Sequence, residues 1–183
     1  MHLKEFFKKY IEGTPEKALV ADRKIFLCCL TKAVMKGVDI NYSVKNVYIT
    51  SMCIKHLFDK KPAEEFLFII NHLHKMVKYP DKIYKNKTGK RGAFCLVKKI
   101  GNEDYLCSIE IVKIPPAVFG EAVLGISEYG IEKEREEIQI ATAFRLRDDK
   151  YTKNYTLLWD WGNGNPHRSA LDAPVKGSTN APQ

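Results

Sequence analysis

The sequence contains no long apolar run, no paired-cysteine spacing and no uninterrupted apolar N-terminus. Its longest apolar stretches, IFLCCL and FLFII, are far shorter than the roughly 20 residues that cross a bilayer. The five cysteines are an odd number without CxxC spacing, a pattern typical of buried reduced thiols. Charged residues interrupt MHLKEFFKKY, so this segment has no signal-peptide core. We therefore expect a cytoplasmic protein without a membrane partner.

Motifs for nucleotide, metal and serine-nucleophile chemistry are also missing. The chain has no P-loop, no GxSxG, no dinucleotide fingerprint and no acid cluster with magnesium-ligand spacing. His72 and His74 are two apart on a predicted helix and point to different faces, which argues against a two-histidine metal site. We therefore expect no metal and no cofactor.

What the sequence does have is positive charge. Lysine and arginine total 30 against 22 acids, a formal net charge of +8 in 183 residues. This balance favours a phosphate-bearing partner, although anionic lipid or plain solubility would also explain it. The hydrophobic share of 45% is enough for one domain with a real core.

The first half of the chain has mostly helical periodicity. Apolar residues recur at helical spacing from Leu3 to Ile11 and predict an amphipathic helix over the first dozen residues that ends near Gly13. Thr14-Pro15-Glu16 could start a second short helix. The stretch IFLCCLTKAVM fits either a buried strand followed by a turn or a helix reaching Gly37. NVYIT predicts a strand, followed by a helix capped by Ser51, and Pro62 is expected at the first position of a longer helix.

The second half changes to strand periodicity. IYKNK, GAFCLVKKI and EDYLCSIEIVKI predict successive antiparallel strands, and EIQIATAFRLRD predicts another. Between them, residues 115–137 are expected to form a loop or short helix on the solvent side. DKYTKNYTLLWDW is expected to form a terminal helix or an extended cap, and the polar residues 162–183 a disordered tail.

The strongest local feature is a basic hairpin from Lys82 to Lys99, which carries seven cations and no acid. A phosphate backbone would neutralise these cations, and Tyr84 and Phe94 could stack bases. The alternative is a solvated edge made basic to prevent strand addition. The candidate RNA-binding residues here are Lys85, Lys87, Lys90, Arg91 and Lys98.

Two strands carry candidate chemical groups. Alternation puts Glu110 in mid-strand on the face of Leu106, Ser108 and Val112, where it could be a general base or a structural ion-pair partner. In the next strand, alternation groups Ile138, Ile140, Thr142 and Phe144 on one face, and Gln139, Arg145 and Arg147 on the other. Arg145 could hold a phosphate or belong to a solvated surface.

One histidine stands out by its position. His56 lies on the predicted short helix that directly follows the strand NVYIT. An imidazole there could act as acid or base near neutral pH, and a hydrogen-bonded structural histidine is the ordinary alternative.

Four segments, in order, resemble the phage-type branch of the barnase/EndoU/colicin/RelE-like nuclease superfamily. They are ITSMCIKHLFDKK, the helix ending in KYPDKIYKN, KRGAFCLVKKIGNEDYLCSIEI and IATAFRLRDDKYTKNYTLLWDW. The resemblance implies an α+β fold with N-terminal helices on one face of a four- to five-stranded antiparallel sheet and a substrate groove on the other. It divides the chain into a helical or mixed N-terminal extension over 1–46, a nuclease domain over 47–161 and a tail over 162–183.

The resemblance places the family's histidine on His56, its threonine-containing strand on Thr142, and its basic and aromatic ending on Arg145, Tyr151 and Lys153. Members of the family often carry a second histidine shortly after the first. Here that stretch reads DKKP, so Lys60 or Lys61 substitutes for it or catalysis is impaired.

The function implied is a metal-independent endoribonuclease in a bacterial cytoplasm, toxin-like or encoded by a phage or prophage. RNA would be its substrate, and a cognate inhibitor protein is a further expected partner. His56 or Glu110 would transfer protons, Thr142 would hold the scissile phosphate, and Arg91, Arg145 and Lys153 would stabilise charge on it. The alternatives are a catalytically silent RNA-binding module and a partner-binding protein that uses LLWDW as an anchor.

Overall fold

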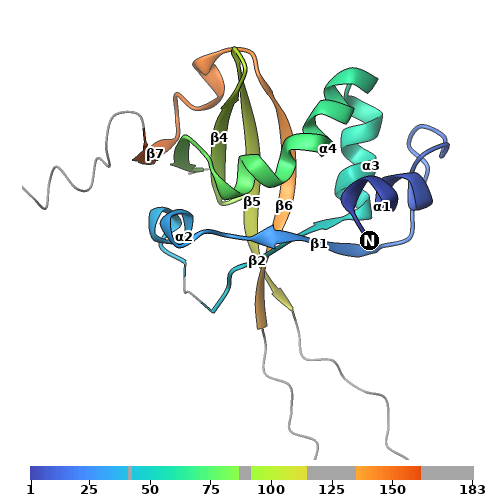
Figure 1. The fold of residues 1–183 in the computed structure, drawn as a ribbon, viewed down its shortest axis with the longest axis horizontal. Helices are drawn as coiled ribbons and strands as arrows, with labels where there is room; N and C mark the ends of the chain where they lie inside the picture. The colour runs from blue at the N-terminus through green and yellow to red at the C-terminus, as the bar shows by residue number, and fades with distance from the viewer. Residues whose placement is uncertain (41–42, 87–91, 115–134, 162–183) are drawn as a thin grey trace, which may run out of the picture.

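The structure is a computed structural model that describes residues 1–40, 43–86, 92–114 and 135–161. These residues form an α+β fold in which four helices pack against a seven-stranded, mostly antiparallel sheet (Figure 1). None of the described helices combines the length and the apolar character needed to cross a membrane.

The strands lie in the order β1-β2-β6-β5-β4-β3-β7. All neighbouring pairs are antiparallel except β2 and β6, which run parallel. The strand bounds are β1 Lys24–Cys29, β2 Asn46–Thr50, β3 Lys82–Lys85, β4 Phe94–Ile100, β5 Glu103–Ile114, β6 Arg135–Leu146 and β7 Thr156–Asp160.

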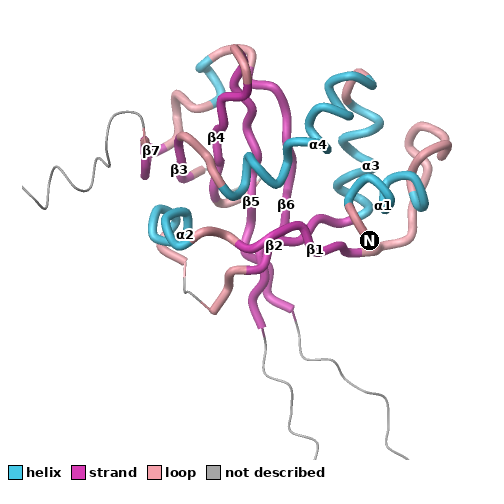
Figure 2. Tube along the Cα trace, viewed as in Figure 1, coloured by secondary structure: helices cyan, strands magenta, loops and turns pink. Residues whose placement is uncertain are grey.

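The four helices cover one face of the sheet (Figure 2). They are α1 Leu3–Tyr10, α2 Lys32–Val38, α3 Ser51–Lys60 and α4 Ala63–Lys78. The apolar stripe of α4, which includes Ile69 and Leu73, packs into the same core as Cys107 and Ile138 of the sheet. Buried residues of all four described helices belong to this one core, so these helices pack on the same face of the sheet. We call the opposite face the helix-free face.

The helix-free face is only partly covered. Cys95, Val97 and Leu106 form a small second cluster there, with Phe144 packed against it. The chain after β6 turns through a 3-10 helix, Asp149–Tyr151, and the Tyr151 ring lies 4.8 Å from that of Phe144. The rest of this face, toward β6, β2 and β1, contains the pocket described below.

The prediction of an α+β fold is confirmed, but the predicted sheet of four to five antiparallel strands is wrong, because the sheet has seven strands and one of its pairs, β2 and β6, is parallel. The stretch IFLCCLTKAVM supplies an extra strand, β1, followed by the helix α2, so it combines the strand of one open interpretation with the helix of the other. TLLWD supplies another, β7, where a helix or cap was expected. Both additions are edge strands that pair with β2 and β3, respectively. The place of a strand in the sheet depends on neighbours that are distant in the sequence, so local patterns did not show that these two segments extend the sheet.

Four local predictions also need correction. Residues 135–137, which were expected to belong to a loop or short helix, form the start of β6, and the rest of that expected loop, residues 115–134, lies outside the described residues. Thr14-Pro15-Glu16 starts no helix and lies in a turn region. Thr50, rather than Ser51, caps α3, because its Oγ1 accepts the backbone N–H of Cys53 at 3.1 Å. The Ser51 hydroxyl is buried and donates to the carbonyl of Ala21. Pro62 is the N-cap of α4 rather than its first helical residue.

Candidate active site

A pocket of about 440 Å³ opens between α3 and the helix-free face of the sheet. It brings together three predicted site residues that are far apart in the sequence: His56 from α3, Glu110 from β5 and Thr142 from β6. The other lining residues are Thr50, Cys53, Gly92, Gln139, Ile140 and Ala141. An imidazole, a carboxylate and hydroxyl groups therefore share one solvent-accessible site.

The first turns of α3 position His56. The Thr50 cap fixes the start of the helix, and the Cys53 thiol donates to the Ala141 carbonyl at 3.7 Å, which holds α3 against β6. His56 follows Cys53 by three residues, so both side chains lie on the same side of the helix. Both residues line the pocket, and His56 is exposed whereas Cys53 is half-buried.

The environment of the thiol in this pocket does not activate it for nucleophilic attack. Burial, and to a smaller extent the negative charge of Glu110, raise the pKa of Cys53 to about 12. A thiol that stays protonated at neutral pH is weakly nucleophilic. The groups suited to proton transfer in the pocket are therefore His56 and Glu110.

A β-bulge in β6 turns Thr142 into the pocket. Ser108 pairs with Thr142 and Ile109 with Ile140, so Ala141 is the extra residue. The bulge reverses the alternation after Ile140. The prediction that Thr142 and Phe144 share a face with Ile138 and Ile140 is therefore wrong, because the two isoleucines face the helices while Phe144 packs on the opposite face.

Close backbone packing forms another part of the pocket wall. Gly92 has a φ of +91°, and a Cβ atom at this position would lie 2.3 Å from the Ser108 hydroxyl and 2.8 Å from the Ile109 carbonyl oxygen. Only glycine accommodates both the positive φ and this approach. The basic residues Lys87, Lys90 and Arg91 directly precede Gly92 in the sequence and lie outside the described residues.

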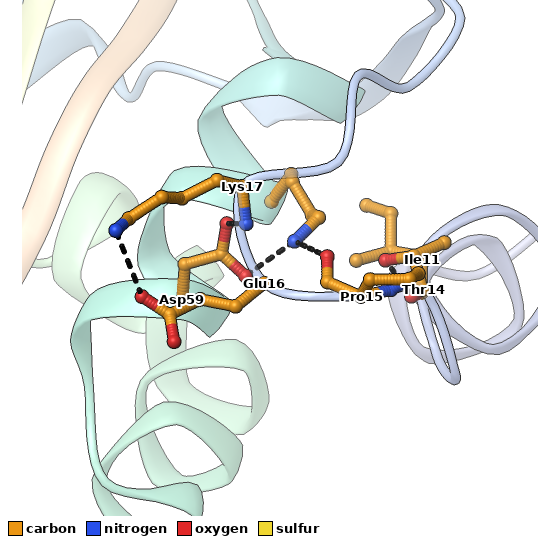
Figure 3. Close-up of polar contacts among 7 residues, drawn as sticks. Ile11, Thr14, Pro15, Glu16, Lys17 and Asp59 are labelled. Carbon is orange, nitrogen blue, oxygen red and sulfur yellow. Dashed lines mark hydrogen bonds and ion pairs between the residues drawn. The ribbon is translucent and has the colours of Figure 1, made fainter.

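Polar contacts join α3 to the turn after α1, and Asp59 of α3 takes part in them (Figure 3). The Lys55 ammonium donates to the carboxylate of Asp59 one turn later and, at 2.8 Å, to the carbonyl of Pro15. The other carboxylate oxygen of Asp59 accepts the backbone N–H of Lys17 at 3.0 Å. These bonds tie α3, the helix that carries His56, to the turn after α1.

The structure places Arg145 away from the pocket. Arg145 pairs across the strands with Tyr105, whose ring belongs to the helix-covered core. Its guanidinium lies 3.0 Å from the carboxylate of Glu103. Among the described residues, the nearest cation in sequence to His56 on the same side of α3 is Lys60, one helical turn further on.

A second, basic pocket of about 500 Å³ lies near β3, at the other end of the sheet, and is lined by Lys82, Tyr84, Lys150, Thr152 and Lys153. The structure brings the predicted residue Lys153 together with two other lysines here. Lys82 also lies 3.6 Å from the buried carboxylate of Asp160, and Lys150 lies 3.9 Å from the exposed carboxylate of Asp148.

The remaining predicted RNA-binding residues are dispersed. Lys98 donates to Asp81 at 2.7 Å, and Lys85 is exposed at the end of β3 on the side of Ile83. Tyr151 is 46% exposed beside Phe144. The structure therefore separates Lys98 and Lys85 from the pocket that contains His56.

Sequence reasoning missed Thr50, Cys53 and Gln139 as lining residues. Cys53 carries a detectable signal, since it precedes His56 by three residues on a predicted helix. Gln139 carries none, because its place in the pocket depends on its pairing with Glu110. In the described part of the chain, no three histidine, cysteine, aspartate or glutamate side chains group together as a metal site.

Comparisons of the chain with protein-family models, curated proteins and solved structures find no match.

Proposed function

We propose that this protein is a metal-independent ribonuclease whose active site is the pocket lined by His56, Glu110 and Thr142. The observation that carries the proposal is the shared pocket of one imidazole and one carboxylate, supplied by α3 and β5. Two groups that can exchange protons on either side of a bound phosphodiester are the minimum for acid–base cleavage of RNA.

In the proposed reaction, the Glu110 carboxylate removes the proton from a ribose 2′-hydroxyl, and the 2′-oxygen attacks the adjacent phosphorus. The bond from phosphorus to the 5′-oxygen breaks, and the protonated imidazole of His56 donates its proton to that oxygen. The products are a 2′,3′-cyclic phosphate and a 5′-hydroxyl. Thr142 and Thr50 offer hydroxyl groups for hydrogen bonds to the phosphate.

The presence or absence of a cation near the pocket bears on the main alternative to a nuclease, an RNA-binding module without catalysis. No lysine or arginine is among the described residues that line it. A module that only binds RNA would not need a cation near the acid–base pair. The nuclease needs a cation at that place to stabilise the negative charge that develops on the phosphoryl oxygens. We assign that role to Lys60, one turn beyond His56.

We predict that purified protein cleaves single-stranded RNA in EDTA and leaves 2′,3′-cyclic phosphate and 5′-hydroxyl ends. The same sequence made as DNA or as 2′-O-methyl RNA should stay intact, because neither offers a free 2′-hydroxyl. End analysis of the fragments checks both results. Cleavage of DNA, 5′-phosphate ends or a requirement for added divalent metal would overturn the mechanism, and binding without cleavage would favour the RNA-binding module.

We further propose that the basic pocket around Tyr84 holds the phosphate backbone of the bound RNA. Replacing both exposed lysines, Lys150 and Lys153, by glutamine should flatten the plot of log affinity against log salt by about 1.4, since each phosphate contact on a single strand contributes about 0.7. Binding titrations with 2′-O-methyl RNA at several salt concentrations measure this slope.

The matched control replaces Lys4 and Lys8 of α1 by glutamine. These lysines are exposed on the helix-covered side, and their loss changes the net charge equally. The control should leave the slope close to that of the wild type. Equal slopes for the two double variants would place the RNA backbone elsewhere on the protein.

A further inference from the structure

We infer that Phe26 is a stacking platform for a nucleobase of single-stranded RNA, next to the proposed active site. Phe26 lies on β1 and is 51% exposed, although it is a large apolar side chain. The inference rests on the proposed function for its choice of ligand, and its test measures binding separately from cleavage.

Strand pairing connects Phe26 to the active-site pocket in a single row of side chains. Phe26 pairs with Tyr48, Tyr48 with Gln139, and Gln139 with Glu110. Paired residues of neighbouring strands face the same side of a sheet. All four side chains therefore lie on the helix-free face, where Gln139 and Glu110 already line the pocket of His56.

The length of this row suits an oligonucleotide. Neighbouring strands are about 4.8 Å apart, so Phe26 lies about 14 Å from Glu110 across three strand spacings. A base near the scissile bond would therefore reach Tyr48, and the next base along the strand would reach Phe26.

The Phe26 ring packs against Tyr48, which in turn has charged neighbours. It contacts Tyr48 edge-to-face, with ring centroids 5.9 Å apart and an interplanar angle of 71°. The Lys24 ammonium lies over the Tyr48 ring, 4.9 Å from its centroid. It also forms an ion pair with the buried carboxylate of Glu137 at 2.6 Å. Gln139 donates to the same carboxylate at 2.8 Å. A braced and exposed aromatic ring loses little entropy when a base stacks on it.

The charge around the platform favours RNA over an apolar partner. A pocket of about 400 Å³ beside Tyr48 is lined by three cations, Lys24, Lys45 and Arg135, and by two acids, Glu136 and Glu137. Glu137 is already bonded to Lys24, so Lys45 and Arg135 together outweigh Glu136. A positive surface next to an exposed ring is the combination that binds single-stranded nucleic acid without sequence preference.

The test uses a 2′-O-methyl RNA oligonucleotide, which the proposed reaction cannot cut. Phe26→Ala should weaken its binding by about tenfold or more, because a stacked base contributes that much to affinity. Phe26→Trp should restore binding, since any large aromatic ring can stack. The matched control is Tyr79→Ala, which removes another exposed aromatic ring, 58% exposed at the end of α4, and should leave binding unchanged.

Oligonucleotides that carry one abasic nucleotide identify the stacked base. When the missing base is the one that stacks on Phe26, the wild-type protein should bind the oligonucleotide more weakly, and binding by Phe26→Ala should be unaffected. If Phe26→Ala binds RNA with wild-type affinity, the platform is overturned. It is also overturned if Phe26→Trp fails to restore binding and weakens the binding of every oligonucleotide equally. A change in oligomeric state on Phe26→Ala without loss of RNA binding overturns it as well, and assigns the ring to contact between copies.

The two proposals fail in different ways. If the platform is correct and the nuclease is not, Phe26-dependent binding persists while RNA shows no cyclic-phosphate ends. If the nuclease is correct and the platform is not, RNA is cleaved in EDTA and Phe26→Ala binds as the wild type does.

Discussion

His56→Ala should lower the rate of RNA cleavage by about two orders of magnitude or more while the protein stays folded. A positioned proton-transfer group contributes about 10²–10⁴ to the rate, and the exposed imidazole of His56 packs into no core. Single-turnover cleavage of RNA in EDTA measures the effect, and thermal melts of both proteins confirm equal folding.

Glu110→Gln provides the companion measurement, because it keeps the shape of the side chain and removes only the carboxylate. If the two residues act as one acid–base pair, the double variant should be hardly slower than the slower single variant. A structural histidine makes the opposite forecast: His56→Ala would melt earlier and cleave normally per folded molecule. That result would remove His56 from the active site.

Asp59→Asn should lower the free energy of unfolding by about 3 kcal/mol, because it leaves the ammonium of Lys55 buried without a counter-charge. The side chains of Lys55 and Asp59 are only 5% and 11% exposed. In a chain of this length, a loss of that size lowers the melting temperature by about 6–12 °C. Chemical denaturation at neutral pH measures the free energy directly.

The pH dependence of this loss has a definite sign. The hydrogen bond from Lys55, assisted by that from the backbone of Lys17, lowers the pKa of the Asp59 carboxyl below its ordinary value of 3.8. A carboxyl with a lowered pKa in the folded state stabilises the fold above the unfolded value and loses this contribution as the pH falls. The stability difference between wild type and Asp59→Asn should therefore be full at neutral pH and should shrink as the pH falls below 3.8.

Two further variants test whether the loss of stability in Asp59→Asn comes from the ion pair with Lys55. Glu64→Gln removes an exposed carboxylate from the first turn of α4 and should change stability by no more than about 0.5 kcal/mol. The double change of Lys55→Met and Asp59→Leu replaces the whole pair by apolar groups and should recover much of the loss. A stability difference that stays constant from pH 7 down to pH 3 would mean that the ion pair does not carry the effect.

Several features could be predicted from the sequence because they depend on short-range patterns. The apolar periodicity of residues 3–11 and of the segment after Pro62 predicted α1 and α4, and the alternation in NVYIT predicted β2. The same patterns identified His56 as a histidine directly after a strand, and Glu110 as a carboxylate in mid-strand. They did not reveal which of these groups would meet.

The tertiary structure alone decided the composition of the site. The parallel pairing of β2 with β6 brings α3 beside β6, and it places Gln139 between Tyr48 and Glu110. The bulge at Ala141 turns Thr142 into the pocket, whereas Arg145 points to the helix-covered side.

The physical reason is that the two kinds of information have different ranges. Helix and strand periodicities follow from the geometry of a few consecutive residues, so the sequence by itself determined the α+β class and most of the elements. Strand order, register and bulges depend on which distant apolar faces can be buried together. They therefore determine whether an imidazole and a carboxylate more than fifty residues apart share a pocket.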